Sequence, residues 1–175
     1  MHSHLLNLAG QKTGRINVSL YGLLLDYRSV AQYALSTRTI GALATGPYEI
    51  NSRWSVLYAA EFAKQRNFGN NPNYVSANYY LAELGPGWRG VGLKGGYALL
   101  QGRSANDEVT TPLANPFNGF TELFGTTPNV GASNGLEALY LTASGTVKAL
   151  GGTAAAMTYY DYHSDSNRIH YMAAS

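Results

Sequence analysis

Apolar and polar residues alternate most clearly through residues 53–65. One set of alternate positions is apolar with aromatic ends, whereas the other set is mixed and includes charged residues. Because successive side chains of a strand point to opposite faces, the segment predicts a strand with two chemically different faces. Two such faces are typical of a strand that contacts lipid on one side and water on the other. The apolar set comprises Trp54, Val56, Tyr58, Ala60 and Phe62.

About eight segments along the chain show alternating or apolar residues bounded by turn-forming residues. Most are roughly 8–13 residues long, which is close to the length that crosses a bilayer in a tilted strand. We therefore expect an all-β protein, an antiparallel up-and-down meander of about eight long strands that forms a partial transmembrane β-barrel. The expected strands are 15–26, 34–44, 53–65, 75–85, 88–100, 136–148, 153–163 and 168–174.

The connections between these strands fall into two alternating classes. Those after the second, fourth and sixth strands are short, at 45–51, 86–87 and 149–152. The others are longer on average and rich in Asn, Asp, Ser and Pro, and the longest is 101–135. Outer-membrane barrels have short turns at one end and long loops at the outer end. The sequence thus predicts one domain over 1–175, incomplete as a barrel, whose long external loop enters the lumen, caps it or packs on itself.

The composition is unusual for a soluble enzyme and excludes several functions. Only 13% of residues are charged, about half the usual share. No apolar run reaches the roughly 18 residues of a membrane helix, yet a mean hydropathy of -0.16 is compatible with a barrel whose apolar residues occupy every second position. The chain has no Cys, which excludes disulfides and thiolate chemistry, and its net charge of +2 is too small to indicate nucleic-acid binding. We expect no cofactor.

The expected strands 88–100 and 136–148 repeat the separation of the two faces. In each, an apolar set alternates with small or polar residues, which include Lys94 and Tyr140. The apolar sets of these strands and of 53–65 are expected to contact lipid. The lipid-facing residues are Trp54, Val56, Tyr58, Phe62, Val91, Leu93, Tyr97, Leu139 and Leu141.

A channel needs a water-filled path and a field of the right sign, which Arg and Lys supply for anions. A carboxylate within a strand should face the lumen, because contact with lipid is costly. We expect Glu61 to pair with Lys94 or Arg38 across the lumen; the alternative for each cation is a place at the membrane rim or in a local ion pair. Tyr140 is the best placed tyrosine for contact with a sugar ring, since Thr142 shares its face. The lumen candidates are Arg38, Arg53, Glu61, Glu83, Lys94 and Tyr140.

Short strings in a consistent order carry a resemblance to a known family. They include LYAAEFAKQ at 57–65, NYYLAELG at 78–85 and GLEALYL at 135–141. Together they are similar to the C-terminal part of the alginate export family, over about residues 21–162. Members of that family are outer-membrane β-barrels of Gram-negative bacteria, and the best known exports alginate, an anionic polysaccharide, through a positively charged pore.

The resemblance implies an outer-membrane porin or export channel for passive diffusion of an anionic polysaccharide or other small anionic solutes. Its partners would be that solute, outer-membrane lipid and periplasmic export components. Two features depart from the family pattern. Residues 1–7 have no signal-peptide features, and residues 171–175 lack the aromatic terminal strand of a barrel ready for insertion. The strands expected here would make up under half of the family's barrel, and the two departures suggest a partial gene product.

Two non-channel functions of a β-sheet protein compete with this interpretation. A self-contained eight-strand barrel would have an interior filled by side chains and would conduct little, and it requires the first and last strands to pair. A soluble all-β sugar-binding module would instead bury Trp54 and Phe62 beneath a second layer. The pairing of the outer strands and the covering of the apolar face therefore distinguish the three possibilities.

Catalytic and metal sites are not expected. His163 is close in sequence to Asp161 and Ser164, but adjacent residues of a strand point to opposite faces, and the chain has no Gly-x-Ser-x-Gly elbow. His2 and His4 lie at an N-terminus that we expect to be frayed, and two histidines without a third ligand do not indicate a metal. The sequence thus predicts that the protein is not an enzyme.

Overall fold

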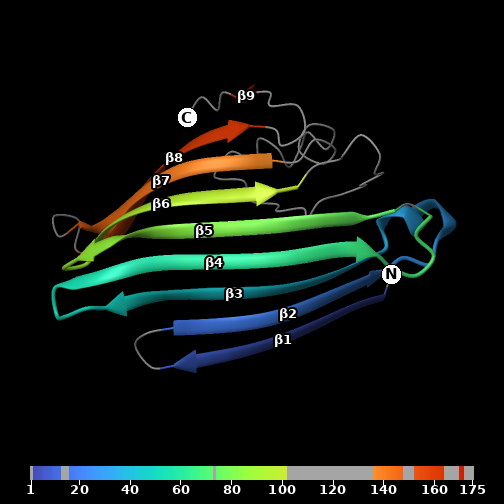
Figure 1. The fold of residues 1–175 in the computed structure, drawn as a ribbon, viewed down its shortest axis with the longest axis horizontal. Coiled ribbons are helices and arrows are strands. Elements are labelled where there is room, and N and C mark those ends of the chain that lie inside the picture. The colour runs from blue at the N-terminus through green and yellow to red at the C-terminus, as the bar shows by residue number, and fades with distance from the viewer. Residues whose placement is uncertain are drawn as a thin grey trace.

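The computed structural model describes residues 2–12, 16–72, 74–101, 136–147, 152–163 and 170–171. In these residues antiparallel strands form one sheet, and each strand pairs with the next along the chain. Figure 1 shows the long strands side by side along the longest axis of the molecule. The strands are β1 (His2–Lys12), β2 (Ile16–Asp26), β3 (Thr37–Glu49), β4 (Trp54–Asn67), β5 (Ser76–Trp88), β6 (Val91–Leu100), β7 (Leu136–Val147), β8 (Thr153–His163) and the short β9 (His170–Tyr171).

The predicted all-β antiparallel meander is confirmed. The expectation of a frayed N-terminus is wrong, because β1 pairs with β2 from His2 to Lys12. Polar residues at both ends of β1 obscure the short alternation of Leu6 and Leu8 that marks it as a strand. The expected strand 34–44 begins later than predicted, since Val30–Leu35 forms a 3-10 helix, η1.

The sheet is open in the part of the chain that the structure describes. Strand β1 has β2 as its one neighbour, and β9 has β8 as its one neighbour. The pairing of first and last strands that a self-contained eight-strand barrel requires is therefore not present in these residues. One edge of β1 instead presents backbone groups that no described strand satisfies.

Two turns lie further along the chain than predicted. The predicted turns contain Pro47 and Pro86, but both prolines lie within strands. Strand β3 continues through Pro47, and β5 continues through Pro86. Strand β2 pairs with β3 only as far as Thr45, so no described residue on that side needs the N–H that Pro47 lacks. The β5–β6 ladder has a gap at Pro86. The prolines are thus tolerated where the ladders are incomplete.

The turn between β5 and β6 consists of Arg89 and Gly90. Their φ angles are 47° and 84°, and two successive positive φ values are those of the type I′ turn that joins strands tightly. This turn and the β3–β4 turn at residues 50–53 lie at the same end of the sheet, on the left in Figure 1, which we call the turn end.

Two longer connections, 27–36 and 68–72, lie at the opposite end, which we call the loop end (Figure 1). Asn71 joins them, because its Nδ2 donates to the carbonyl oxygens of Ala34 at 3.1 Å and Ser36 at 2.7 Å. The backbone N–H of Phe68 also donates to the Ser36 carbonyl at 3.1 Å. Hydrogen bonds from the Asn71 side chain and from the Phe68 backbone therefore hold the two connections together at the loop end.

Some predictions lie outside the described residues. These are the loop 101–135 apart from Gln101, the turn 149–152 apart from Gly152, residue Ser164, and the strand 168–174 apart from His170 and Tyr171.

Candidate functional site

Strand register assigns the side chains of the sheet to two faces, because residues directly opposite on paired strands share a face. The polar face is defined by the row Glu83, Gly96, Tyr140 and Tyr160 on β5 to β8. The apolar face is defined by the row Leu20, Ala42, Phe62 and Tyr80 on β2 to β5.

The buried side chains of the sheet lie on the polar face. Leu100, Leu136, Ala138 and Tyr162 form a buried cluster on β6 to β8, and Ala63 is fully buried on β4. The packed side of the sheet is thus its more polar side, which is the reverse of a soluble one-sheet protein.

No described element covers the apolar face, and its large side chains are exposed. Ile40 is 69% exposed, Leu84 66% and Leu139 58%. The chain exposes 11416 Å², whereas a compact protein of 18.8 kDa exposes roughly 8,300 Å². No described element forms the second layer that a soluble sugar-binding module requires. All residues expected to contact lipid lie on this face, namely Trp54, Val56, Tyr58, Phe62, Val91, Leu93, Tyr97, Leu139 and Leu141.

The two ends of the apolar face differ in chemistry. At the turn end Trp54 and Trp88 are directly opposite, with ring centroids 6.4 Å apart, and the Arg89 guanidinium carbon lies 5.3 Å from the Trp88 centroid. At the loop end of β3 and β4, Arg38 and Arg66 are directly opposite. Aliphatic and aromatic side chains lie between these ends. The apolar face therefore has an aromatic border and a basic border.

The polar face contains a hydrogen-bonded carboxylate in the middle of β5. Glu83 accepts hydrogen bonds from Lys94 Nζ at 2.6 Å and from the Tyr140 hydroxyl at 2.5 Å. Tyr140 reaches across β6 because Gly96, directly opposite, has no side chain; a Cβ there would lie 2.2 Å from Tyr140 Cζ. Tyr160 packs on Tyr140 with ring centroids 5.1 Å apart. The Glu83 side chain is 14% exposed, so these partners offset much of the cost of burying its charge.

The same arrangement occurs on β2 to β4. The Tyr21 hydroxyl donates to Glu61 at 2.5 Å. Its ring crosses β3 at Gly41, where a Cβ would lie 2.3 Å from Tyr21 Cζ. Each of the two tyrosines thereby connects three neighbouring strands on the polar face, and each has a glycine beneath its ring.

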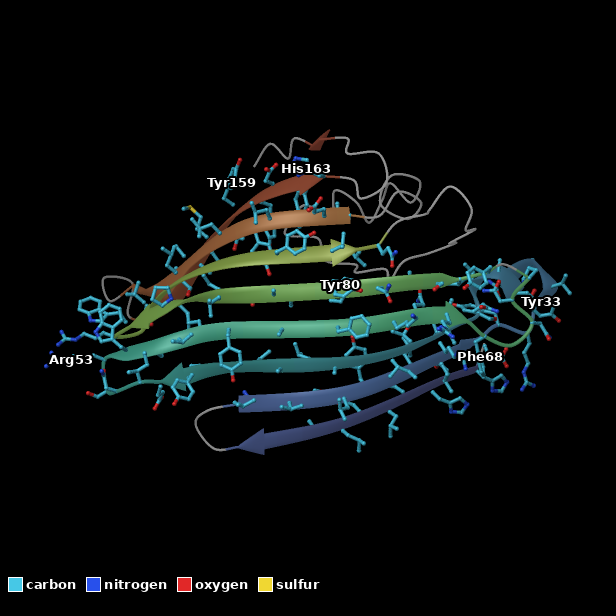
Figure 2. All side chains as sticks on the ribbon, viewed as in Figure 1. Tyr33, Arg53, Phe68, Tyr80, Tyr159 and His163 are labelled. Carbon is cyan, nitrogen blue, oxygen red and sulfur yellow. The ribbon has the colours of Figure 1, made fainter. Side chains whose placement is uncertain are left out.

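The structure brings four lumen candidates together on the polar face and leaves two elsewhere. Glu61, Glu83, Lys94 and Tyr140 lie on this face. Arg38 lies on the opposite, apolar face, and Arg53 lies in the β3–β4 turn, where its N–H donates to Asn51 Oδ1 at 2.9 Å. Figure 2 shows Arg53 at the turn end, far from Phe68 at the loop end.

The ion pairs also differ from the expectation for Glu61. Lys94 pairs with Glu83, whereas Glu61 accepts from Tyr21, and Arg38 is on the other face from Glu61. The order of the strands explains the difference. Lys94 and Glu83 are on the neighbouring strands β6 and β5, whereas Glu61 is on β4, one strand further away. Among the described strand residues, the charged side chains of the polar face are Glu49, Glu61, Glu83 and Lys94.

Three further tyrosines, Tyr79, Tyr160 and Tyr162, share the polar face, and sequence reasoning did not place them there. The rings of Tyr160 and Tyr162 are stacked, with centroids 5.2 Å apart and an interplanar angle of 5°. The alternation of Thr158, Tyr160 and Tyr162 on one side of β8 is the sequence signal that could have placed the last two of these tyrosines. With these residues the polar face carries an aromatic cluster beside the Glu83 ion pair.

The structure places two residues of the histidine cluster considered in the sequence, and it bears on metal sites in the described residues. Asp161 and His163 share the apolar face, and no group of three or more His, Asp or Glu in the described ranges could hold a metal ion. Nor is any helix among these residues long and apolar enough to cross a membrane. No model of a known protein family matches the chain, and no curated protein matches it. The resemblance to the alginate export family therefore stays a prediction.

Proposed function

We propose that the sheet forms part of the wall of an outer-membrane β-barrel channel in a Gram-negative bacterium. In this arrangement the apolar face contacts lipid and the polar face lines water. The observation that carries the proposal is the uncovered apolar face with its aromatic and basic borders. A soluble protein exposes apolar patches of only a few hundred Å², whereas a lipid-facing barrel surface is apolar between interfacial girdles.

The height of the apolar face supports this proposal. On β4 the apolar stretch of this face lies between Trp54 and Lys64, which are separated by ten residue steps. At about 3.3 Å per residue, the steps span about 33 Å along the strand. A strand tilt of about 40° reduces this to about 25 Å along the membrane normal, which is the height of the apolar band of outer-membrane barrels.

Successive hairpins are displaced along the strand direction from one edge of the sheet toward the other. Asn17 is in register, strand by strand, with Tyr140 on β7. Toward the turn end, β2 extends one residue past Asn17, to Ile16, whereas β7 extends from Tyr140 to Val147. The turn end thus advances across the sheet, and such a stagger accompanies the tilt of strands in barrels.

The open edges fit the proposal only if further strands close the wall. In lipid an unpaired backbone group costs several kcal/mol, so a sheet edge does not persist in the hydrocarbon region. We propose that the free edge of β1 pairs with another strand when the barrel assembles.

For the solute, the polar face favours a polysaccharide. Tyr79, Tyr140 and Tyr160 present rings and hydroxyl groups of the kind that pack on and hydrogen-bond to sugars. Lys94 is the cation on the described strands of this face and is already paired with Glu83. The aromatic cluster thus supports a polysaccharide as the solute, as in the alginate export family, whereas the anionic character of that solute rests on the family resemblance.

Planar-bilayer recording of the full chain, assembled into the closed barrel that the proposal requires, tests this function. We expect stepwise currents that a soluble oligosaccharide interrupts, and we expect Tyr140→Ala to shorten these interruptions, because it removes a ring from the polar face. Tyr159→Ala, on the apolar face, is the matched control and should leave them unchanged. The reversal potential in a KCl gradient measures the anion preference. A bilayer-inserted chain that gives no stepwise current would contradict the channel.

A further inference from the structure

A group of cations lies at the loop end of the apolar face, outside the polar face just described. Arg38 and Arg66 are directly opposite on β3 and β4, and Lys64 lies one row nearer the middle of the sheet on the same face. His4 lies two strands away in the same row as Arg38. Both arginines are exposed, and Lys64 is half-buried. With Lys64 and His4 included, these four residues make up the basic border of the apolar face.

No carboxylate compensates the two arginines in the described part of the chain. Neither Arg38 nor Arg66 takes part in a salt bridge there; the ion pairs found are Arg28 with Asp26 and Lys94 with Glu83. On the apolar face of β1 to β5, Asp26 is the one acidic residue among those described. Like charges directly opposite on paired strands destabilise a sheet. The basic border is therefore an arrangement that a bound anion would stabilise.

An apolar hollow of about 660 Å³ adjoins the basic border. Arg38 and His4 are among its lining residues, and its volume is that of an ordinary ligand pocket. Its floor includes Gly22, where a Cβ would meet nothing closer than the Thr39 carbonyl oxygen at 3.9 Å. The space above Gly22 is thus open and bordered by hydrocarbon. The aliphatic lining residues are Leu5, Leu6, Leu8, Leu20, Leu24 and Ile40.

We propose that this surface binds a lipid whose head group carries a phosphate monoester, with an acyl chain in the hollow and the phosphate on Arg38 and Arg66. The guanidinium groups match phosphate geometry through paired N–H donors. Lys64 extends its apolar stem along the face and its ammonium group to the same head group. The proposal rests on the proposed function, since it takes the apolar face to contact lipid.

A lipid fits these observations better than a free anion or an acidic peptide. The hollow is apolar and begins beside the cations, so one ligand that has an acyl chain and a phosphate uses both parts. A free phosphate would leave the hollow unused, and a peptide would need backbone hydrogen bonds that the face of a sheet does not offer.

Native mass spectrometry of the full chain, folded in neutral detergent micelles, tests the site with phosphatidic acid, phosphatidylcholine and inorganic phosphate as probes. We expect phosphatidic acid to bind at least about tenfold more tightly than phosphatidylcholine, and inorganic phosphate not to displace it. Replacing both Arg38→Gln and Arg66→Gln should weaken the binding of phosphatidic acid by about tenfold, because the two lost charge-assisted contacts together contribute on that scale.

Two further variants separate the hollow from the charges. Gly22→Leu fills the hollow without a backbone clash and should weaken phosphatidic acid binding while the strand content, measured by circular dichroism, stays the same. Arg89→Asn removes a cation at the turn end and should change nothing. Equal binding of the two lipids, displacement by inorganic phosphate, or unchanged binding in the double arginine variant would overturn the site.

The outcome also separates this site from the proposed function. If the apolar face contacts lipid in vesicles but the chain does not prefer phosphatidic acid, the proposed lipid-facing wall is supported and the lipid-binding site is refuted. If the chain prefers phosphatidic acid in micelles but does not enter vesicles, the lipid-binding site is supported and the proposed lipid-facing wall is refuted.

Discussion

At the scale of single residues, Gly96 is important because its missing side chain lets the Tyr140 ring cross β6 and reach Glu83. The Tyr21 ring crosses Gly41 in the same way and reaches Glu61. An aromatic ring over a glycine on the neighbouring strand also covers backbone that would otherwise contact water. The polar face thus combines hydrogen bonds with packing across three strands.

Tyr140→Phe should lower the free energy of unfolding by about 1.5–3 kcal/mol, because it removes a hydrogen bond to the charged Glu83 while the ring stays over Gly96. Urea unfolding of the chain in lipid vesicles measures the change. Tyr159→Phe is the control, since Tyr159 is 71% exposed on the apolar face and has no hydrogen bond in the described ranges. An equal effect of the two substitutions would show that the Glu83 bond contributes nothing.

At the scale of strands, β5 and β6 approach each other unusually closely beside Pro86. A Cβ on Gly85 would lie 1.9 Å from the Leu93 carbonyl oxygen and 2.6 Å from Lys94 Cα. The missing N–H of Pro86 leaves this part of the ladder without regular pairing. A side chain at position 85 would therefore clash with the backbone of β6, whereas on β6 Gly95 faces open space and Gly96 faces the Tyr140 ring.

Gly85→Ala should destabilise the sheet by about 1–3 kcal/mol, because the added methyl group forces the two strands apart. Gly95→Ala is the matched control on β6, where a Cβ meets nothing closer than the Leu84 carbonyl oxygen at 4.0 Å. It should have little effect or stabilise slightly, since alanine loses less backbone entropy in a strand than glycine. Urea unfolding midpoints compare the two variants, and similar midpoints would refute the close approach.

Local alternation was sufficient to predict the strands whose two faces differ strongly. Strand β4 is the clearest example, because Trp54, Val56 and Phe62 alternate with polar residues. It was insufficient for β3, where both faces are mixed, so it could not show that Arg38 and Glu61 lie on opposite faces. A shift of one residue reverses the face of a whole strand. The side of Arg38 is set by its partners Leu24 and Arg66 on other strands, which no single segment reveals.

The candidate site was partly predictable for the same reason. Glu61, Glu83 and Lys94 could be placed on one face by the cost of exposing them to lipid. Their partners could not be predicted, because the pairing of Lys94 with Glu83 and of Tyr21 with Glu61 depends on the register between strands. Cross-strand contacts of this kind are non-local in sequence.

At the scale of the whole molecule, a single sheet has one packed side and one uncovered side. The packed side carries the ion pair and the tyrosines, and the uncovered side carries Ile40, Leu84 and other large apolar residues. In water this arrangement would leave a large apolar surface unsatisfied. The account therefore depends on the claim that lipid covers the apolar face.

The absence of Cys in the chain allows this claim to be tested with single cysteines and no background labelling. Leu84→Cys and Leu81→Cys are matched variants on β5, three residues apart on opposite faces. Each is labelled with an environment-sensitive fluorophore after the chain is folded into lipid vesicles that contain a nitroxide-labelled lipid. The account predicts blue-shifted, strongly quenched emission at residue 84 and weak quenching at residue 81. Equal quenching at the two positions, or none at residue 84, would contradict it.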